Sequence, residues 1–133
     1  AWIPGSPQKL VVSECCQGHS PKCPQGLARW KVFELNKDLE KVKFLHNIER
    51  RAAPEYLGCA DGFKVHPNSG LIVSSCPQGL CVVDLKQKRV TVKLHMGRKT
   101  SNVAFGGGYM WITGERRLWR IPLAGEVRAK HEL

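Results

Sequence analysis

The 133-residue sequence lacks long apolar runs and strong helical segments. No stretch approaches the roughly 18 consecutive apolar residues of a membrane-spanning helix, and no signal-peptide pattern opens the chain. There is no Asn-x-Ser/Thr sequon, and because the first residue is Ala, we expect that residue 1 is not a native translation start. The 13 Gly and 8 Pro disfavour long helices and coiled coils but are compatible with many short strands.

Acidic residues are scarce, since 11 Asp and Glu stand against 21 Lys and Arg, for a net charge of +10. Such an excess can indicate a surface that binds nucleic acid or another polyanion. The cations are spread along the chain, however, and clusters stay as short as Arg50 with Arg51 or Arg116 with Arg117. We therefore expect these cations to lie on solvated strand faces and loop tips. Nucleic-acid binding is the less favoured interpretation.

Alternation of apolar and polar residues with a period of two dominates the sequence and is typical of β-strands. Gly, Asn and Pro separate the alternating segments as turn signals. One segment, 48–56, could form a helix, although Pro54 interrupts it. The ten expected strands are 9–14, 27–35, 42–45, 62–66, 70–75, 79–85, 89–94, 101–105, 109–113 and 117–123.

The expected strands form a repeat. The sequence Cys-Pro-Gln-Gly-Leu occurs at 23–27 and again at 76–80, each time leading into a strand. Strands of a second type begin at Leu10, Leu71 and Met110. A unit of about 40–60 residues with up to four strands is the size of a β-propeller blade. The pattern favours blades over a generic antiparallel sandwich, which does not need identical turns.

The fold predicted from this repeat is all-β: a partial propeller of about three antiparallel, four-stranded blades. Propellers close about 4–8 blades around a channel, so three blades would leave two apolar sheet faces open to water. We expect a part of a longer protein, a chain that associates with itself to complete a ring, or an unstable fragment. The blade-like units are about 1–58, 59–100 and 101–133.

Several segments in order along the chain resemble the senescence-marker-protein-30/gluconolactonase family, also called the regucalcin family. Asp61-Gly-Phe-Lys-Val-His-Pro-Asn-Ser-Gly-Leu-Ile-Val resembles its Asp-Gly-Met-Lys-Val-Asp…Gly-x-Leu-Tyr-Val stretch. Ser101-Asn-Val-Ala-Phe-Gly-Gly is similar to its Thr-Asn-x-Ala-Phe-Gly-Gly signature. Further matches lie at 79–85, 110–113 and 118–121. The resemblance covers nearly the whole chain and is most specific over 61–123.

Members of that family are six-bladed propellers with one divalent cation at the channel centre, so the resemblance implies the C-terminal half of such a ring. The family's ligands are a Glu near its N-terminus, an Asn, and the Asp of Asp-Gly-Met. Only the last has a counterpart here, Asp61. It follows Ala60, where the family usually has Pro. The resemblance implies Ca²⁺ or Zn²⁺, with Mg²⁺ or Mn²⁺ as further candidates, at an incomplete site.

The activity implied by the resemblance is metal-dependent hydrolysis of a small-molecule lactone. A cation would lower the pKa of bound water and polarise the lactone carbonyl, and oxygen ligands such as Asp61 suit these ions. We expect an incomplete fragment with little activity alone, which a missing N-terminal half or self-association would complete. A non-catalytic propeller-type binding module or a degenerate homologue is the alternative, and an Asp-Gly pair is also a common turn.

Six cysteines, at 15, 16, 23, 59, 76 and 81, are too few for a disulfide-dense mini-protein of this length. The sequence Cys15-Cys16-x-x-His19-x-x-x-Cys23 has zinc-ligand residue types at irregular spacing. Free thiols are favoured there over a local disulfide or a zinc ion. Cys76 and Cys81 bracket a turn, and could either pair with each other or serve as small core residues.

The remaining candidates have structural interpretations. The five His residues have no visible Ser or Cys nucleophile partner, so catalytic residues stay unassigned. Trp30, Trp111 and Trp119 fall on expected strands and are expected to pack between blades, and Asn102 is interpreted as a turn residue. The C-terminal Lys-His-Glu-Leu resembles an ER-retrieval tetrapeptide except at its second position. We expect a cytoplasmic protein without membrane association, with the secretory pathway as the alternative.

Overall fold

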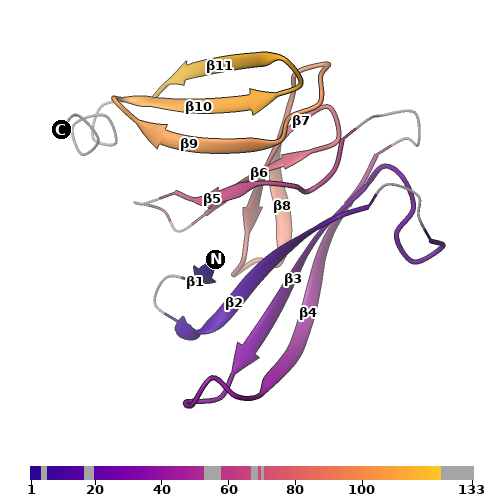
Figure 1. The fold of residues 1–133 in the computed structure, drawn as a ribbon, viewed down its shortest axis with the longest axis vertical. Helices are drawn as coiled ribbons and strands as arrows, with labels where there is room; N and C mark the ends of the chain where they lie inside the picture. The colour runs from indigo at the N-terminus through magenta and orange to yellow at the C-terminus, as the bar shows by residue number, and fades with distance from the viewer. Residues whose placement is uncertain (4–5, 17–19, 53–57, 67–68, 70, 124–133) are drawn as a thin grey trace.

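The computed structural model of the chain describes residues 1–3, 6–16, 20–52, 58–66, 69 and 71–123. These residues form strands and turns, and none of them belongs to a helix, so they offer no helical membrane span (Figure 1). The strands build three antiparallel sheets with four, four and three members. The all-β prediction is therefore confirmed, whereas the third sheet has one strand fewer than expected within the described residues.

Each sheet is a simple meander in which the strands follow one another in chain order. The N-terminal sheet contains β1 (Trp2–Ile3), β2 (Ser6–Cys15), β3 (Leu27–Leu35) and β4 (Val42–Arg51). The central sheet contains β5 (Phe63–Val65), β6 (Ile72–Cys76), β7 (Gly79–Asp84) and β8 (Arg89–His95). The C-terminal sheet contains β9 (Asn102–Gly106), β10 (Tyr109–Gly114) and β11 (Arg117–Pro122). Among the described strands, no sheet closes on itself.

The sequence repeat falls on equivalent strands. The strand type that begins near Leu10, Leu71 and Met110 forms β2, β6 and β10, each the second strand of its sheet. The expected helix over 48–56 is wrong for its first part, because β4 continues to Arg51 and Arg29 pairs with Glu49 across the strands. Residues 53–56 of that expectation lie outside the described residues.

The three sheets pack face to face in chain order. One core joins the N-terminal and central sheets through buried side chains that include Trp30, Ile48 and Ile72. A second core joins the opposite face of the central sheet to the C-terminal sheet, with Leu80 and Ile112 at its centre. The central sheet is therefore covered on both faces, and all five residues of β6 are buried.

Three disulfides use all six cysteines, so the expectation of free thiols at Cys15, Cys16 and Cys23 is wrong. Cys15 pairs with Cys59, and Cys16 pairs with Cys23. Adjacent residues at the end of a strand point to opposite sides, which lets neighbouring cysteines take separate partners. The third bridge joins β6 to β7.

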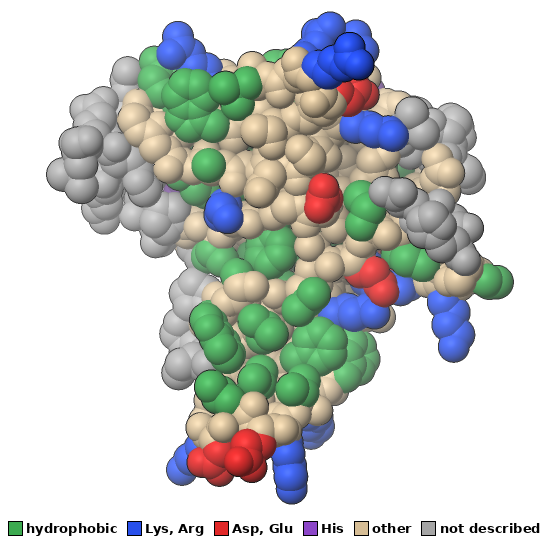
Figure 2. All heavy atoms as spheres, viewed as in Figure 1, with side chains coloured by type: hydrophobic (Ala, Val, Ile, Leu, Met, Phe, Trp, Pro, Cys, Tyr) green, Lys and Arg blue, Asp and Glu red, His purple; other side chains and the backbone are tan. Residues whose placement is uncertain are grey.

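The outer face of the N-terminal sheet carries apolar side chains that no described residue covers (Figure 2). Trp2, Val12, Val42 and Phe44 lie on this face, and between 42% and 63% of each side chain is exposed. We call these four residues the apolar face. Because monomeric proteins rarely expose large contiguous apolar patches, such a surface favours contact with another polypeptide.

Candidate functional site

Asp61 lies just before β5, the first strand of the central sheet, and its side chain is exposed. It lines a pocket of about 400 Å³ together with residues from the loops before β3 and β9, among them Gln25, Lys99 and Ser101. Glu115, in the turn between β10 and β11, lines the same pocket. Loops of all three sheets therefore meet around the one carboxylate that the sequence resemblance selects.

The backbone at Asp61 is fixed by contacts with two of the sheets. Its N–H donates to the Ser75 hydroxyl at 2.8 Å and lies 3.1 Å from the Cys59 carbonyl oxygen. The Ser13 hydroxyl on β2 donates to the Asp61 carbonyl oxygen. Ser75 belongs to β6 and Ser13 to β2, so the central and N-terminal sheets both hold this residue in place.

Gly62 joins the same segment to the C-terminal sheet. Its N–H donates to the Ser101 carbonyl oxygen at 2.6 Å. A Cβ atom at this position would lie 2.4 Å from Cγ of Asn102 and 2.5 Å from the Ser101 oxygen, closer than real Cβ contacts. Glycine is therefore required by the close approach, and the Asp-Gly pair serves here to bring the first strands of two sheets together.

The Asp61 carboxylate makes no hydrogen bond or ion pair with the described part of the chain. Lys99 and Glu115 also line the pocket, and the Glu115 carboxylate lies 4.0 Å from the Arg98 guanidinium. A carboxylate that is exposed and uncommitted can accept a cation or a substrate hydroxyl. A single carboxylate is nevertheless only one of the several oxygen ligands that a divalent ion takes.

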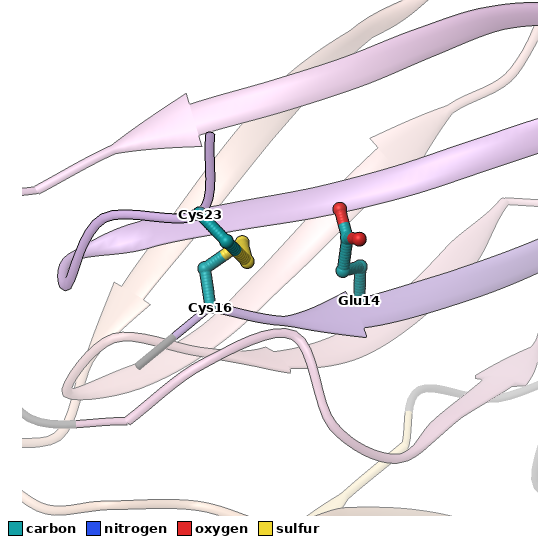
Figure 3. Close-up of side chains that lie close together, drawn as sticks. All are labelled: Glu14, Cys16 and Cys23. Carbon is teal, nitrogen blue, oxygen red and sulfur yellow. A yellow bond between two sulfur atoms is a disulfide. The ribbon is translucent and has the colours of Figure 1, made fainter. Parts of the chain in front are cut away.

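The one group of three potential metal ligands within the described ranges does not include Asp61, although one of its members, Cys16, lines the Asp61 pocket. Glu14, Cys16 and Cys23 place their ligand atoms within 4.8 Å of one another (Figure 3). Cys16 and Cys23 form a disulfide, so neither sulfur is a thiolate, the form that binds zinc. His19 of the expected zinc pattern falls outside the described residues.

The Glu14 carboxylate is already neutralised by two cations. The Lys31 ammonium and the Arg29 guanidinium each lie 2.7 Å from one of its oxygens, and Arg29 also reaches Glu49 at 2.7 Å. The hydrogen bond from Lys31, opposed by partial burial and supported by Arg29, lowers the pKa of Glu14. The arrangement is therefore an ion-pair network across β2, β3 and β4. While Cys16 and Cys23 are joined in a disulfide, Glu14 and these two cysteines form no metal centre.

The structure brings together one set of polar side chains that no sequence pattern connects. Lys9 from β2, His46 from β4, and Lys86 and Lys88 from the turn after β7 line a second pocket of about 550 Å³. We call it the lysine pocket. Its four polar residues come from three separate parts of the chain, so only the short spacing between Lys86 and Lys88 could have drawn attention to it.

Two of the three tryptophans expected on strands pack between sheets, and the third lies on a sheet face away from the cores. Trp30 is fully buried, and its indole N–H donates to the Ser74 hydroxyl at 2.9 Å, which ties the N-terminal sheet to the central one as expected. Trp119 packs against the core between the central and C-terminal sheets, also as expected. Trp111 instead lies on the other face of the C-terminal sheet, where the guanidinium of Arg120 stands 6.0 Å from its ring centre.

Asn102 and His66 have local structural roles. The Asn102 side-chain oxygen accepts the Val103 N–H at 2.8 Å, but Asn102 is the first residue of β9, so its interpretation as a turn residue is wrong. Nδ1 of His66 lies 3.0 Å from the Ser69 hydroxyl, a pair that sequence spacing alone did not suggest. A neighbouring Ser and His do not make a nucleophilic site without an orienting group for the imidazole and donors for an oxyanion.

No protein-family model matches the chain, and no curated protein matches it.

Proposed function

We propose that the chain forms three consecutive blades of a β-propeller, and that its pocket at Asp61 contributes to metal-dependent hydrolysis of a small lactone. The observation that carries this proposal is the state of the Asp61 carboxylate. It is exposed in a pocket and unpaired among the described residues, although its backbone is held by hydrogen bonds from two sheets. Because its backbone is held in place and its carboxylate is unpaired, Asp61 is suited to binding a cation or a substrate.

The packing of the sheets supports the propeller part of the proposal. Each sheet is a meander of neighbouring strands, and the sheets stack face to face in chain order. The first strands of the central and C-terminal sheets, β5 and β9, contact each other, as the innermost strands of adjacent blades would. The apolar face of the N-terminal sheet agrees with a blade whose neighbour belongs to another polypeptide segment.

The chemistry of Asp61 fits a divalent cation in part, because a free carboxylate oxygen is the donor that Ca²⁺, Mg²⁺ and Mn²⁺ prefer and that Zn²⁺ accepts. Such a cation would supply Lewis-acid polarisation and a water of lowered pKa. Lys99 would offer N–H donors to the lactone in the same pocket. The remaining oxygen donors would come from a further polypeptide segment or a second copy of the chain.

The test is the substitution Asp61→Asn, which keeps the size of the side chain and removes its charge. We would measure hydrolysis of glucono-δ-lactone by proton release in the presence of Ca²⁺ or Zn²⁺. The measurement would use two polypeptides: the 133-residue protein, and the longest polypeptide that contains it. The expected result is that metal-stimulated hydrolysis falls to the level seen with a chelator. The matched control, Asp38→Asn, removes an exposed carboxylate in the β3–β4 turn and should keep the full rate.

Two results would overturn the proposal. If Asp61→Asn keeps the same metal dependence, the assignment of Asp61 is wrong. If neither polypeptide shows metal-stimulated hydrolysis, the lactonase activity itself is wrong. The second result would favour a non-catalytic binding module, the candidate that the apolar face supports, because exposed Trp2, Val42 and Phe44 suit contact with another polypeptide whether or not a metal is bound.

A further inference from the structure

The lysine pocket lies at the end of the N-terminal and central sheets that is remote from Asp61. Asp61 contacts Ser13 near the end of β2, whereas Lys9 lies near the beginning of that strand. In Figure 1 the turn between β7 and β8 lies beside the first part of β2, and the lining of the pocket confirms that they meet. The pocket is therefore a separate feature with a volume of about 550 Å³.

His46 gives the clearest sign that this pocket suits a ligand. Its Nε2 atom is buried and has no hydrogen-bond partner, and it is the single buried side-chain nitrogen or oxygen of which this is true within the described residues. Buried polar atoms in folded proteins almost always have a partner, so such an exception calls for a water, an ion or a ligand. The imidazole lines the pocket, so a molecule bound there could supply the partner.

The lysines of the pocket are equally uncompensated. None of the ion pairs formed by described residues includes Lys9, Lys86 or Lys88. Two carboxylates flank the pocket without lining it: Glu34, which is opposite Lys9 across the strands, and Asp84, whose Oδ1 accepts the backbone N–H of Lys86. Three lysines therefore line one cavity without an ion-pair partner among the described residues, and an anion bound there could pair with them.

The apolar part of the lining limits what kind of anion fits. Ile3, Val32, Leu45 and Leu85 form the remaining wall, and Ile3 and Leu85 also pack against the core between the two sheets. A bare inorganic ion would leave this wall in contact with water. A molecule with an apolar body and one strongly anionic group would use both halves of the lining.

We propose that the lysine pocket binds a small organic phosphate, with the phosphate between the three lysines and Nε2 of His46 and the organic group against the apolar wall. A phosphate is favoured over a carboxylate because it carries more charge and more acceptor oxygens for three ammonium groups. This proposal is independent of the lactonase proposal, since it shares no residue with the Asp61 pocket.

The electrostatics of His46 provide a second readout. Burial, followed by the charges of Lys88 and Lys9, lowers the pKa of His46. The charged groups around the imidazole are Lys9 on β2 and Lys86 and Lys88 after β7, with Glu34 on the neighbouring strand. A bound phosphate would place negative charge against the ring and favour its protonated form, so the pKa of His46 must rise on binding.

The experiment is a calorimetric titration of the 133-residue protein with phenyl phosphate, benzoate and inorganic phosphate. We expect phenyl phosphate to bind most tightly. The double variant Lys86→Gln/Lys88→Gln should weaken it at least about tenfold. The matched control Lys37→Gln/Lys41→Gln removes the same charge from the exposed β3–β4 turn and should change affinity less than about twofold, because distant surface charges are screened.

Histidine NMR signals followed through a pH titration, with and without phenyl phosphate, locate the ligand. A rise in the pKa of His46 on binding supports the proposal. Absence of binding, an equal loss in both double variants, or an unchanged His46 pKa would each overturn it. An oligonucleotide that binds more tightly than phenyl phosphate and equally well to both variants would also overturn it, because diffuse attraction to the net charge would then explain the binding.

Discussion

The N-terminal and central sheets share one topology, four antiparallel strands in chain order, yet they differ in how deeply they are buried. The central sheet has a partner on each face, and β6 is buried at every position. The N-terminal sheet has a partner on one face only, and seven of the ten residues of β4 are exposed. The meander alone therefore does not decide which strands form the core.

The residues of the two sheets reflect this difference. β6 is Ile-Val-Ser-Ser-Cys, a run of small and apolar residues whose hydroxyls are satisfied internally, as when Ser74 accepts the Trp30 indole N–H. In β3, buried Trp30 and Val32 alternate with Arg29 and Lys31, which face outward into the ion-pair network. A strand covered on both faces loses alternation, whereas a strand covered on one face keeps it.

The strongest way to test this comparison is to remove the side chain that links the two sheets. Trp30→Ala should lower the free energy of unfolding by about 3–5 kcal/mol, because it leaves a large cavity and removes the indole N–H that donates to the Ser74 hydroxyl. Phe44→Ala on the apolar face is the control. Phe44 is 51% exposed and packs mainly on Phe33, so its loss should cost less than about 1.5 kcal/mol.

Urea denaturation of both variants measures this difference. Equal losses of stability would mean that the core between the sheets is not where the structure locates it.

The disulfides sharpen the comparison, because one lies between the sheets and one within the central sheet. Cys15 and Cys59 are 44 residues apart and join β2 to the segment before β5, whereas Cys76 and Cys81 are 5 residues apart. In the chain-entropy model the longer loop contributes about 4 kcal/mol and the shorter about 2 kcal/mol. Replacing both Cys15 and Cys59 with alanine should therefore destabilise the protein more than replacing both Cys76 and Cys81.

Thermal unfolding of the two double variants under oxidising conditions gives the comparison directly. If the pair within the central sheet proves the more costly to remove, local packing around buried Cys76 and Cys81 outweighs the loop effect, and the link between the sheets matters less than proposed.

The smallest expected effect concerns the outward face of the N-terminal sheet. Lys31 and Arg29 lower the pKa of Glu14, so its contribution to stability is complete above the unfolded-state pKa and is lost as pH falls through the lower, folded-state pKa. Glu14→Gln should cost at most about 1 kcal/mol at neutral pH. The difference from the original protein should vanish in strong acid.

Urea denaturation across this pH range checks the expectation, with Glu40→Gln in the exposed β3–β4 turn as the control. A cost for Glu14→Gln that persists unchanged in acid would contradict an electrostatic role for the network.

Local alternation predicted much of the strand pattern. The expected strand 27–35 coincides with β3, and the repeated motifs fall on equivalent strands. The end of β4 was missed because Glu49, Arg50 and Arg51 look like a charged helix surface, and only the cross-strand contact of Glu49 with Arg29 explains them. Asp61 was selected by resemblance, yet the need for Gly62 beside it depends on Asn102, which lies far away in the sequence.

The parts that could not be predicted are those that depend on long-range contacts. Nothing near Cys15 indicates that Cys59 is its partner. The lysine pocket likewise depends on how two sheets pack, because its cations come from β2 and from the turn after β7. Residue spacing reports periodicity within a strand, but it carries no information on which faces meet.

The disulfides of the neighbouring cysteines at the end of β2 make the stability of the fold depend on the redox environment. Cys15 is bonded to the segment before β5, and Cys16 is bonded to the loop that leads into β3. Two disulfides therefore connect the end of β2 to two different parts of the chain. If both disulfides were reduced, the two sheets would be joined by their packed side chains and by hydrogen bonds such as those from Trp30 to Ser74 and from Ser13 to Asp61. The redox state of the surroundings would then set how firmly the Asp61 segment is anchored.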